Sequence, residues 1–83
     1  MSRPLYTIAQ EIAKDWQRPY FGAVPYVKAL GELESINDTY GCDTASSVVA
    51  YFLSNAATWR GEVARRIKKE LKAMLDAFYK GRF

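Results

Sequence analysis

Apolar residues along the first segment of the chain recur at spacings of three and four residues. They are Leu5, Ile8, Ile12 and Trp16. Residues at this spacing share one face of an α-helix, so the pattern predicts a helix over about residues 3–17. Ser2 is a suitable N-cap, and Pro4 in the first turn would cost no hydrogen bond. Pro19 predicts that the helix ends before it.

Residues 19–26 combine helix-breaking side chains with aromatic ones. The breakers are Pro19, Gly22 and Pro25, and the aromatic residues are Tyr20, Phe21 and Tyr26. Two prolines and a glycine interrupt any regular structure here. Solvated linkers rarely carry so many aromatic rings, so we expect an ordered loop. This loop either closes the core or presents a surface to a partner.

Pro25 predicts the start of a second helix, because proline is well suited to a first helical turn. The apolar stripe of this helix would comprise Val27, Leu30, Leu33 and Ile36. Gly41 is its expected end, since glycine readily adopts the left-handed conformation that closes a helix.

A third helix is predicted to follow a cap at Asp43 or Thr44. Its apolar positions are Ala45, Val48, Val49, Phe52, Leu53 and Ala56. The run from Val48 to Leu53 would also suit a buried strand. We favour a helix because the sequence offers no second strand to pair with it.

The last predicted helix follows a break at residues 55–58, with Thr58 as its cap, and runs to about Lys80 before Gly81. Winding residues 59–80 as a helix gathers an apolar arc of Val63, Ile67, Leu71, Met74, Leu75 and Phe78. The sequence therefore predicts an all-α single domain over residues 1–83. It would be a compact bundle or an orthogonal array of about four helices, the last one long and amphipathic.

Size and composition place limits on partners and compartment. The chain has 83 residues, of which 49% are hydrophobic and 25% are charged, as in ordinary globular domains. A domain this small has a thin core, so a second copy of the chain or another partner would add stability. The single cysteine, Cys42, favours a reducing compartment, and we expect a cytoplasmic protein. Polar residues interrupt the N-terminal segment and no run of about 18 apolar residues occurs, so we expect neither a signal peptide nor membrane association.

Charge is distributed unevenly along the chain. Up to Thr58 there are four basic and six acidic residues, whereas from Trp59 onward there are eight basic and three acidic ones. The basic residues opposite the apolar arc of the last helix are Arg65, Lys68, Lys69 and Lys72. This face is either a solvated surface or a nucleic-acid site, because clustered cations release counterions from phosphate. A helix-turn-helix with its turn at residues 55–58 fits only loosely.

The sequence lacks the residues that many enzymes require. It contains no histidine, which excludes imidazole as a general base or zinc ligand. Its five glycines are scattered, so there is no glycine-rich phosphate loop. Glu34, Asp38 and Asp43 are near one another in sequence, but acidic residues around a turn usually cap it or remain solvated. We expect no enzymatic activity, cofactor, metal site or small-molecule substrate.

Three stretches carry a resemblance to a known group of proteins. They are Pro-Tyr-Phe-Gly-Ala-Val-Pro-Tyr at 19–26, Tyr-Phe-Leu-Ser-Asn-Ala at 51–56 and Thr-Trp-Arg-Gly-Glu-Val-Ala-Arg-Arg-Ile-Lys at 58–68. With them the chain resembles a small uncharacterised protein family of bacteriophages that infect actinobacteria. The resemblance covers residues 4–75 and transfers no functional residues. It implies action in the cytoplasm of a bacterial host cell, through a host or phage protein or nucleic acid.

Two hypotheses about function follow. The first is a non-enzymatic binding protein that acts through protein–protein contact, with a homodimer as one form of that contact. Aromatic residues and arginine dominate many interfaces, and the candidate interface residues are Tyr20, Phe21, Tyr26, Trp59 and Arg60. The alternative is a nucleic-acid-binding protein that uses Arg65, Lys68, Lys69 and Lys72.

Overall fold

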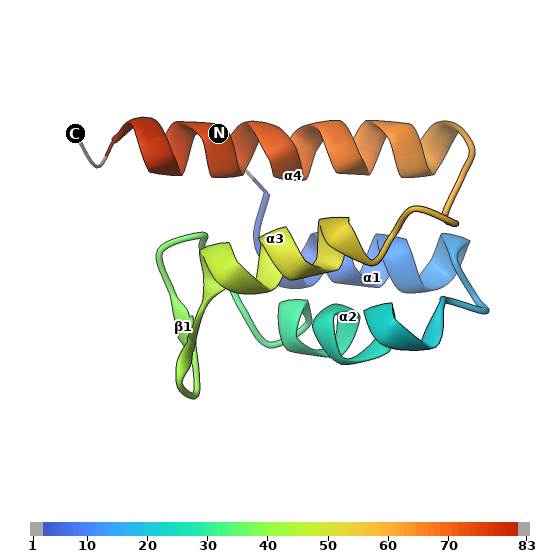
Figure 1. Ribbon diagram of the computed structural model, residues 1–83, viewed down its shortest axis with the longest axis horizontal. Coiled ribbons are helices and arrows are strands. Elements are labelled where there is room, and N and C mark those ends of the chain that lie inside the picture. The colour runs from blue at the N-terminus through green and yellow to red at the C-terminus, as the bar shows by residue number, and fades with distance from the viewer. Residues whose placement is uncertain (1–2, 82–83) are drawn as a thin grey trace.

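Four α-helices and one short β-hairpin make up the computed structural model, which describes residues 3–81. The elements in chain order are α1 (Leu5–Asp15), the 3-10 turn η1 (Phe21–Ala23), α2 (Val24–Leu30), β1 (Thr39–Tyr40), β2 (Asp43–Thr44), α3 (Ala45–Ser54) and α4 (Glu62–Lys80). In Figure 1, α4 lies along one side of the molecule and α2 along the other, with α1 and α3 between them. The predicted helical class with a long last helix is confirmed.

The first predicted helix is confirmed as α1, and its buried residues are Leu5, Ile8, Ala9 and Ile12. Pro4 precedes the helix as its N-cap rather than lying inside the first turn. The Leu5 amide donates a hydrogen bond to the Glu34 carbonyl oxygen at 2.8 Å. The Tyr6 amide donates one to the Leu33 carbonyl oxygen, also at 2.8 Å. A distant backbone segment therefore satisfies the first amides of α1. Ser2, the predicted cap, lies outside the described residues.

The second helix is much shorter than predicted. It ends at Leu30, and the expected end at Gly41 is wrong. Asp38 supplies part of the reason, because its Oδ2 accepts hydrogen bonds from the amides of Glu34 at 3.1 Å and Ser35 at 3.0 Å. Such bonds give the backbone partners that compete with a helix.

A β-hairpin that the sequence did not predict follows this turn. In its antiparallel pairing Thr39 is opposite Thr44, and Tyr40 is opposite Asp43. Gly41 lies in the connection with φ of 60°, a left-handed conformation that glycine adopts readily. The need for a left-handed glycine was therefore identified correctly, but it serves a hairpin and not a helix end.

The third predicted helix is confirmed as α3, and its cap is Thr44. The Thr44 Oγ1 accepts a hydrogen bond from the Ser47 amide at 3.1 Å. The buried residues of α3 are Ala45, Ser46, Val48, Val49 and Phe52. The hydrophobic run that would also have suited a strand is therefore helical, and its residues Val48, Val49 and Phe52 are buried.

The last helix begins at Glu62, later than expected, and Thr58 is not its cap. Gly61 takes the N-cap position with φ of 113° and ψ of −177°. Side-chain-bearing residues rarely adopt this conformation. The connection from α3 to α4 thus depends on a glycine that frees the backbone to turn into the helix.

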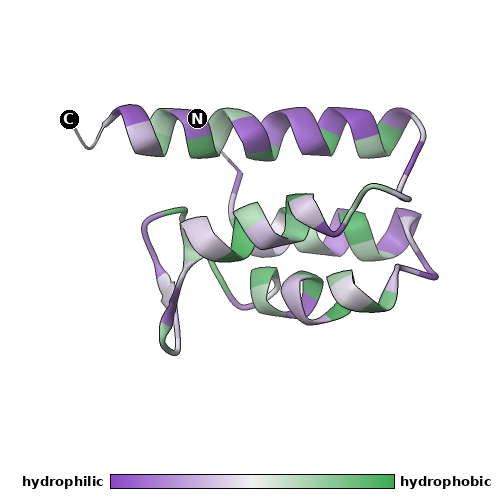
Figure 2. Cartoon of the chain, in the orientation of Figure 1, coloured by the Kyte–Doolittle hydropathy of each residue, from purple (hydrophilic) through white to green (hydrophobic). Residues whose placement is uncertain are grey.

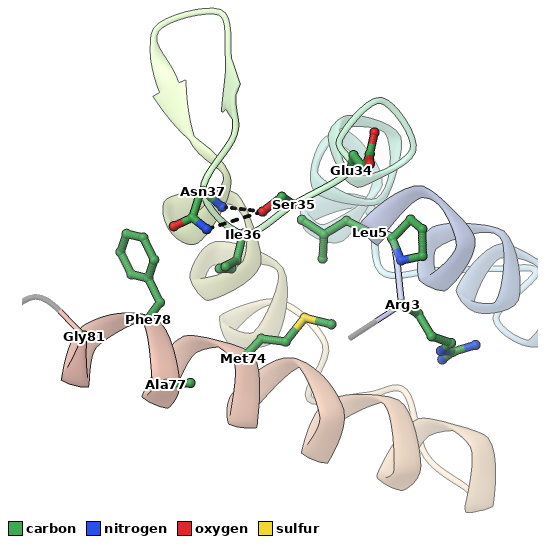
Figure 3. A pocket seen from close by; sticks show the side chains of 11 residues that line it. Arg3, Leu5, Glu34, Ser35, Ile36, Asn37, Met74, Ala77, Phe78 and Gly81 are labelled. Atoms are coloured by element: carbon green, nitrogen blue, oxygen red, sulfur yellow. Dashed lines mark hydrogen bonds between the residues drawn. The ribbon is translucent and has the colours of Figure 1, made fainter. Parts of the chain in front are cut away.

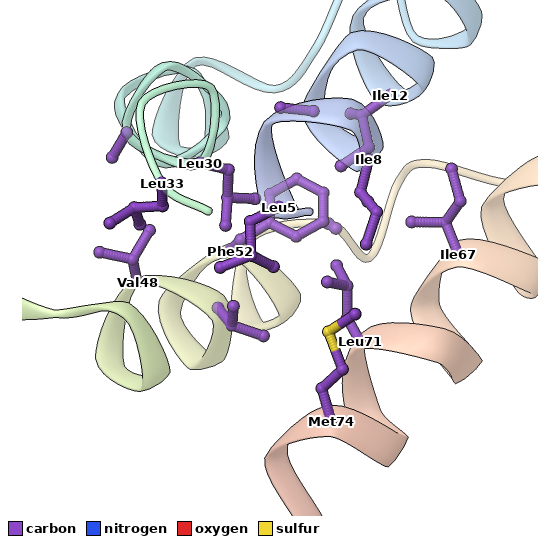
Figure 4. Close-up of a cluster of buried hydrophobic side chains, with 14 of the residues drawn as sticks. Leu5, Ile8, Ile12, Leu30, Leu33, Val48, Phe52, Ile67, Leu71 and Met74 are labelled. Carbon is purple, nitrogen blue, oxygen red and sulfur yellow. The ribbon is translucent and has the colours of Figure 1, made fainter. Parts of the chain in front are cut away.

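The core is formed by one cluster of side chains from all four helices and their connections, part of which is drawn in Figure 4. Its largest fully buried members are Phe52, Leu5, Ile8, Ile12, Leu30, Leu33, Ile67, Leu71 and Val49. Much of α4 is hydrophilic in Figure 2, and its apolar positions include the buried Ile67 and Leu71. Within residues 3–81, no helix is long and apolar enough to span a bilayer.

Candidate protein-interaction surface

The aromatic loop ahead of α2 is ordered and presents two rings to solvent. Phe21 is 78% exposed and Tyr20 is 45% exposed, and their ring centroids lie 4.7 Å apart. A Cβ at Gly22 would lie 2.6 Å from the Tyr20 ring and 2.8 Å from the Asn55 Oδ1 atom. The absent side chain therefore lets the loop pack tightly against the end of α3.

Tyr26 points to a different environment from the other two aromatic residues. It is half-buried and packs against the core. Its ring lies 5.6 Å from that of Tyr51, which is itself 53% exposed. Of the three predicted loop aromatics, Tyr20 and Phe21 are thus presented outward, while Tyr26 helps join α2 to α3.

An apolar groove of about 300 Å³ opens where the end of α1 meets the start of α2. It is lined by Ile12, Ala13, Trp16, Gln17, Pro19, Val24, Val27 and Lys28. Val24, which is 46% exposed, lines the groove and follows η1 directly. We call Tyr20, Phe21, Val24 and this groove the Phe21 surface.

The predicted interface residue Trp59 belongs to the core. It is 2% exposed, and its Nε1–H donates to the Asp15 Oδ2 atom at 2.8 Å. Its ring stacks on Trp16 at 5.5 Å and meets the edge of Phe52 at 6.1 Å. Trp59 therefore joins the start of α4 to α1 and α3 and is not available to a partner. Arg60 beside it is exposed.

Two basic side chains of α4 make contacts within the protein. The Lys68 Nζ atom donates to the Trp59 carbonyl oxygen at 2.6 Å and lies 6.0 Å from the centre of the Trp59 ring. Burial lowers the pKa of Lys68, and the nearby Arg60 charge lowers it further. Arg66 pairs with the carboxylate of Glu11. Lys68, a predicted nucleic-acid contact, is thus partly withdrawn from the surface.

A small ion-pair network surrounds Glu11. Arg3 donates to Glu11 at 2.9 Å and makes a two-pronged contact with Glu70 at 2.7 and 3.0 Å. The hydrogen bonds that Glu11 accepts from Arg66 and then from Arg3 lower the pKa of Glu11, and the hydrogen bonds that Arg3 donates to Glu70 and then to Glu11 raise the pKa of Arg3. The network joins α4 to α1 and to Arg3 in the segment that precedes α1.

The remaining predicted nucleic-acid contacts are Arg65, Lys69 and Lys72, all exposed on α4. None of the three forms an ion pair within 4 Å in the described part of the chain. The structure therefore divides the α4 cations into a set used internally and a set that faces solvent.

A second cleft, of about 570 Å³, separates the C-terminal half of α4 from the turn before the hairpin. Figure 3 shows Leu5, Ile36 and Met74 pointing toward it and Ser35 accepting hydrogen bonds from Asn37. Its lining is mixed, and no group of three metal-ligating side chains is assembled anywhere in residues 3–81.

The sequence singled out Tyr20 and Phe21 but left open whether their rings close the core or face a partner, and it did not indicate the groove. The groove forms only when α1 packs against α2, so no local pattern predicts it. The residue in the sequence that most nearly indicated it was Trp16, at the end of the first apolar stripe. Comparison with other proteins adds no assignment, because no protein-family model, curated protein or solved structure matches the chain.

Proposed function

We propose that the protein is a non-enzymatic binding protein that acts through protein–protein contact at the Phe21 surface. The observation that carries this proposal is a phenylalanine 78% exposed on a short turn whose flanking residues, Pro19 and Val24, line an open apolar groove. Aromatic residues dominate the binding energy of many interfaces, and burying a Phe side chain stabilises a complex by about 1.5–3 kcal/mol.

The conformation of the loop supports the same proposal. The 3-10 turn holds Phe21, and the Tyr20 carbonyl oxygen accepts a hydrogen bond from the Ala23 amide at 2.8 Å. The tight packing at Gly22 restrains the loop further. Side chains that are already ordered lose less entropy on binding, so this surface suits recognition.

The partner is either a different protein, of host or phage origin, or a second copy of the chain. The Phe21 surface carries an exposed ring at Phe21 and a groove lined by Pro19 and Val24, which are two and three residues from Phe21 in sequence. Two copies related by a twofold axis would each place Phe21 against the groove of the other, as in an isologous dimer. The thin core of an 83-residue domain makes either partner a source of stability.

The test is Phe21→Ala, with Tyr6→Ala as the matched control because Tyr6 is an exposed aromatic residue in α1. Light scattering after size exclusion measures a dimer. Affinity capture from bacterial lysate, followed by reconstitution with the purified captured protein, measures a different partner. We expect Phe21→Ala to weaken one of these contacts at least tenfold and Tyr6→Ala to leave it unchanged.

Stability distinguishes binding from packing. Because Phe21 is mostly exposed, its substitution should change the melting temperature by only a few degrees. A monomer that captures the same proteins with and without Phe21 would refute the proposal, as would a loss of stability of several kcal/mol in Phe21→Ala.

A further inference from the structure

We propose that α4 carries a second, separate site that binds the phosphate backbone of duplex nucleic acid. The site is the α4 basic face, which we define as Arg65, Lys69 and Lys72. All three are exposed, and no carboxylate in the described part of the chain lies within 4 Å of their charged groups. Their charges are therefore available to an external anion.

Contacts within the protein separate these cations from their neighbours on α4. Arg66 is held by Glu11, and Lys68 donates to the Trp59 carbonyl oxygen. The carboxylate of Glu70 accepts two hydrogen bonds from Arg3. Arg66, Lys68 and Glu70 thus have partners within the protein, which leaves the basic face with an excess of positive charge.

The spacing of the basic face matches a phosphate backbone. Seven residues separate Arg65 from Lys72, which is about 10.5 Å along a helix. One strand of B-DNA carries a charge about every 3.4 Å of its axis, so this length faces about three phosphates. Three cations on a straight, well-anchored helix can therefore each contact a phosphate.

The composition of the face favours duplex nucleic acid over a protein. Between Arg65 and Asp76, the exposed positions of α4 are Arg65, Arg66, Lys69, Lys72, Ala73 and Asp76. Ala73 is the largest apolar side chain among them, whereas a protein interface usually has an aromatic or large apolar centre. Single-stranded nucleic acid is also disfavoured, because its binding relies on several aromatic rings that stack on successive bases, and this side of α4 offers one exposed ring, Tyr79, which is 47% exposed and lies two turns after Lys72.

Insertion into a membrane surface is excluded by the packing of α4. An amphipathic helix binds a bilayer through its apolar face. In α4 that face is in the core, where Ile67 and Leu71 are each 0% exposed. Only the polar side of the helix is available, and in Figure 1 α4 lies on the side of the molecule away from α2.

Fluorescence anisotropy with a labelled 20-base-pair DNA duplex tests the proposal. Three phosphate contacts predict a slope of about −2.7 for log affinity against log salt, so affinity should fall about 40-fold between 50 and 200 mM NaCl. Arg65→Gln/Lys69→Gln/Lys72→Gln should abolish this binding. The control Lys14→Gln/Arg18→Gln/Lys28→Gln removes the same charge from exposed positions outside α4 and should weaken binding by less than threefold.

A gain of affinity makes the test sharper. Asp76 lies one helical turn after Lys72 and would repel phosphate, so Asp76→Asn should tighten duplex binding about two- to fivefold. A double-stranded RNA of the same length should bind comparably if the backbone is recognised. Absence of binding by the wild-type protein at 50 mM NaCl, an equal loss in the control variant, or tighter binding to single-stranded DNA would each overturn the proposal. Retained melting temperatures confirm that the variants are folded.

Discussion

Replacing Trp59 tests how α4 is joined to the rest of the core. The Trp59 side chain is 2% exposed, stacks on Trp16 at 5.5 Å and donates to the Asp15 carboxylate at 2.8 Å. Trp59→Ala removes the ring and the donor together. Trp59→Phe keeps an aromatic ring and removes the donor. Comparing the two variants therefore separates the loss of the whole ring from the loss of the donor together with the outer part of the indole.

The magnitudes follow from these contacts. Removing the whole ring should destabilise the fold by about 3–5 kcal/mol, toward the upper end because both Trp16 and Phe52 lose an aromatic neighbour. An 83-residue domain has a total stability of about 4–12 kcal/mol. Trp59→Phe should cost about 1–3 kcal/mol, because the smaller ring leaves a cavity at this buried position, while the exposed Asp15 carboxylate can be solvated in place of the lost hydrogen bond. Each kcal/mol lost lowers the melting temperature by about 4–8 °C.

Urea unfolding followed by far-UV circular dichroism measures both variants without relying on tryptophan emission. Asp15→Asn in the Trp59→Phe background is the control and should add little, since the hydrogen bond is already absent. A cost below about 1 kcal/mol for Trp59→Ala would refute the assignment of this residue to the core. It would also restore Trp59 as a candidate interface residue.

Three further predictions concern local features of the fold. Gly61→Ala should destabilise by about 1–3 kcal/mol because of the positive φ, whereas Gly81→Ala, with φ of −70°, should change stability by less than about 0.5 kcal/mol in the same denaturation assay. Asp38→Ala removes the acceptor of two backbone amides and should cost about 0.5–2 kcal/mol, with increased amide exchange at the hairpin. Because the pKa of Glu11 is lowered in the folded protein, its ion pairs stabilise the fold fully above the ordinary pKa of 4.5. This stabilisation is lost as the pH falls through the lower pKa that Glu11 has in the folded state. Glu11→Gln should therefore reduce the difference between urea midpoints at pH 7 and pH 3, and an unchanged difference would contradict this role.

The helices were predictable where an apolar stripe coincided with one continuous element, as in α1, α3 and α4. The end of α2 was not, because Leu33 and Ile36 continue the helical spacing after the chain has left the helix. Both residues lie in a non-helical segment, and their side chains are at least partly buried in the core. Their apolar character therefore reflects packing in the core and not membership of a helix. The hairpin strands have two residues each, which is too short for an alternating pattern to be recognised.

Candidate site residues were harder to predict because composition does not reveal exposure. Phe21 and Trp59 are both large aromatic residues next to helix starts, yet one is 78% exposed and the other 2%. The pairing of Arg66 with Glu11 joins positions 55 residues apart, so no local pattern identifies it. The hydrogen bond from Lys68 to the Trp59 carbonyl oxygen likewise depends on the path of the backbone at Trp59, which no local pattern reveals.

Trp16 explains why the Phe21 surface contains an open groove in a protein with so few residues. A partly exposed tryptophan that was free to move would cover apolar surface beside it. Trp16 is instead held from behind, by the stacked ring of Trp59 and the edge of Phe52, whose centroid lies 6.4 Å away. It therefore forms one wall of the groove while remaining part of the aromatic cluster. The ring contacts hold this wall of the groove in place, so under the proposed function a partner side chain that entered the groove would not have to reorder it, and its affinity would depend chiefly on the apolar area that became buried.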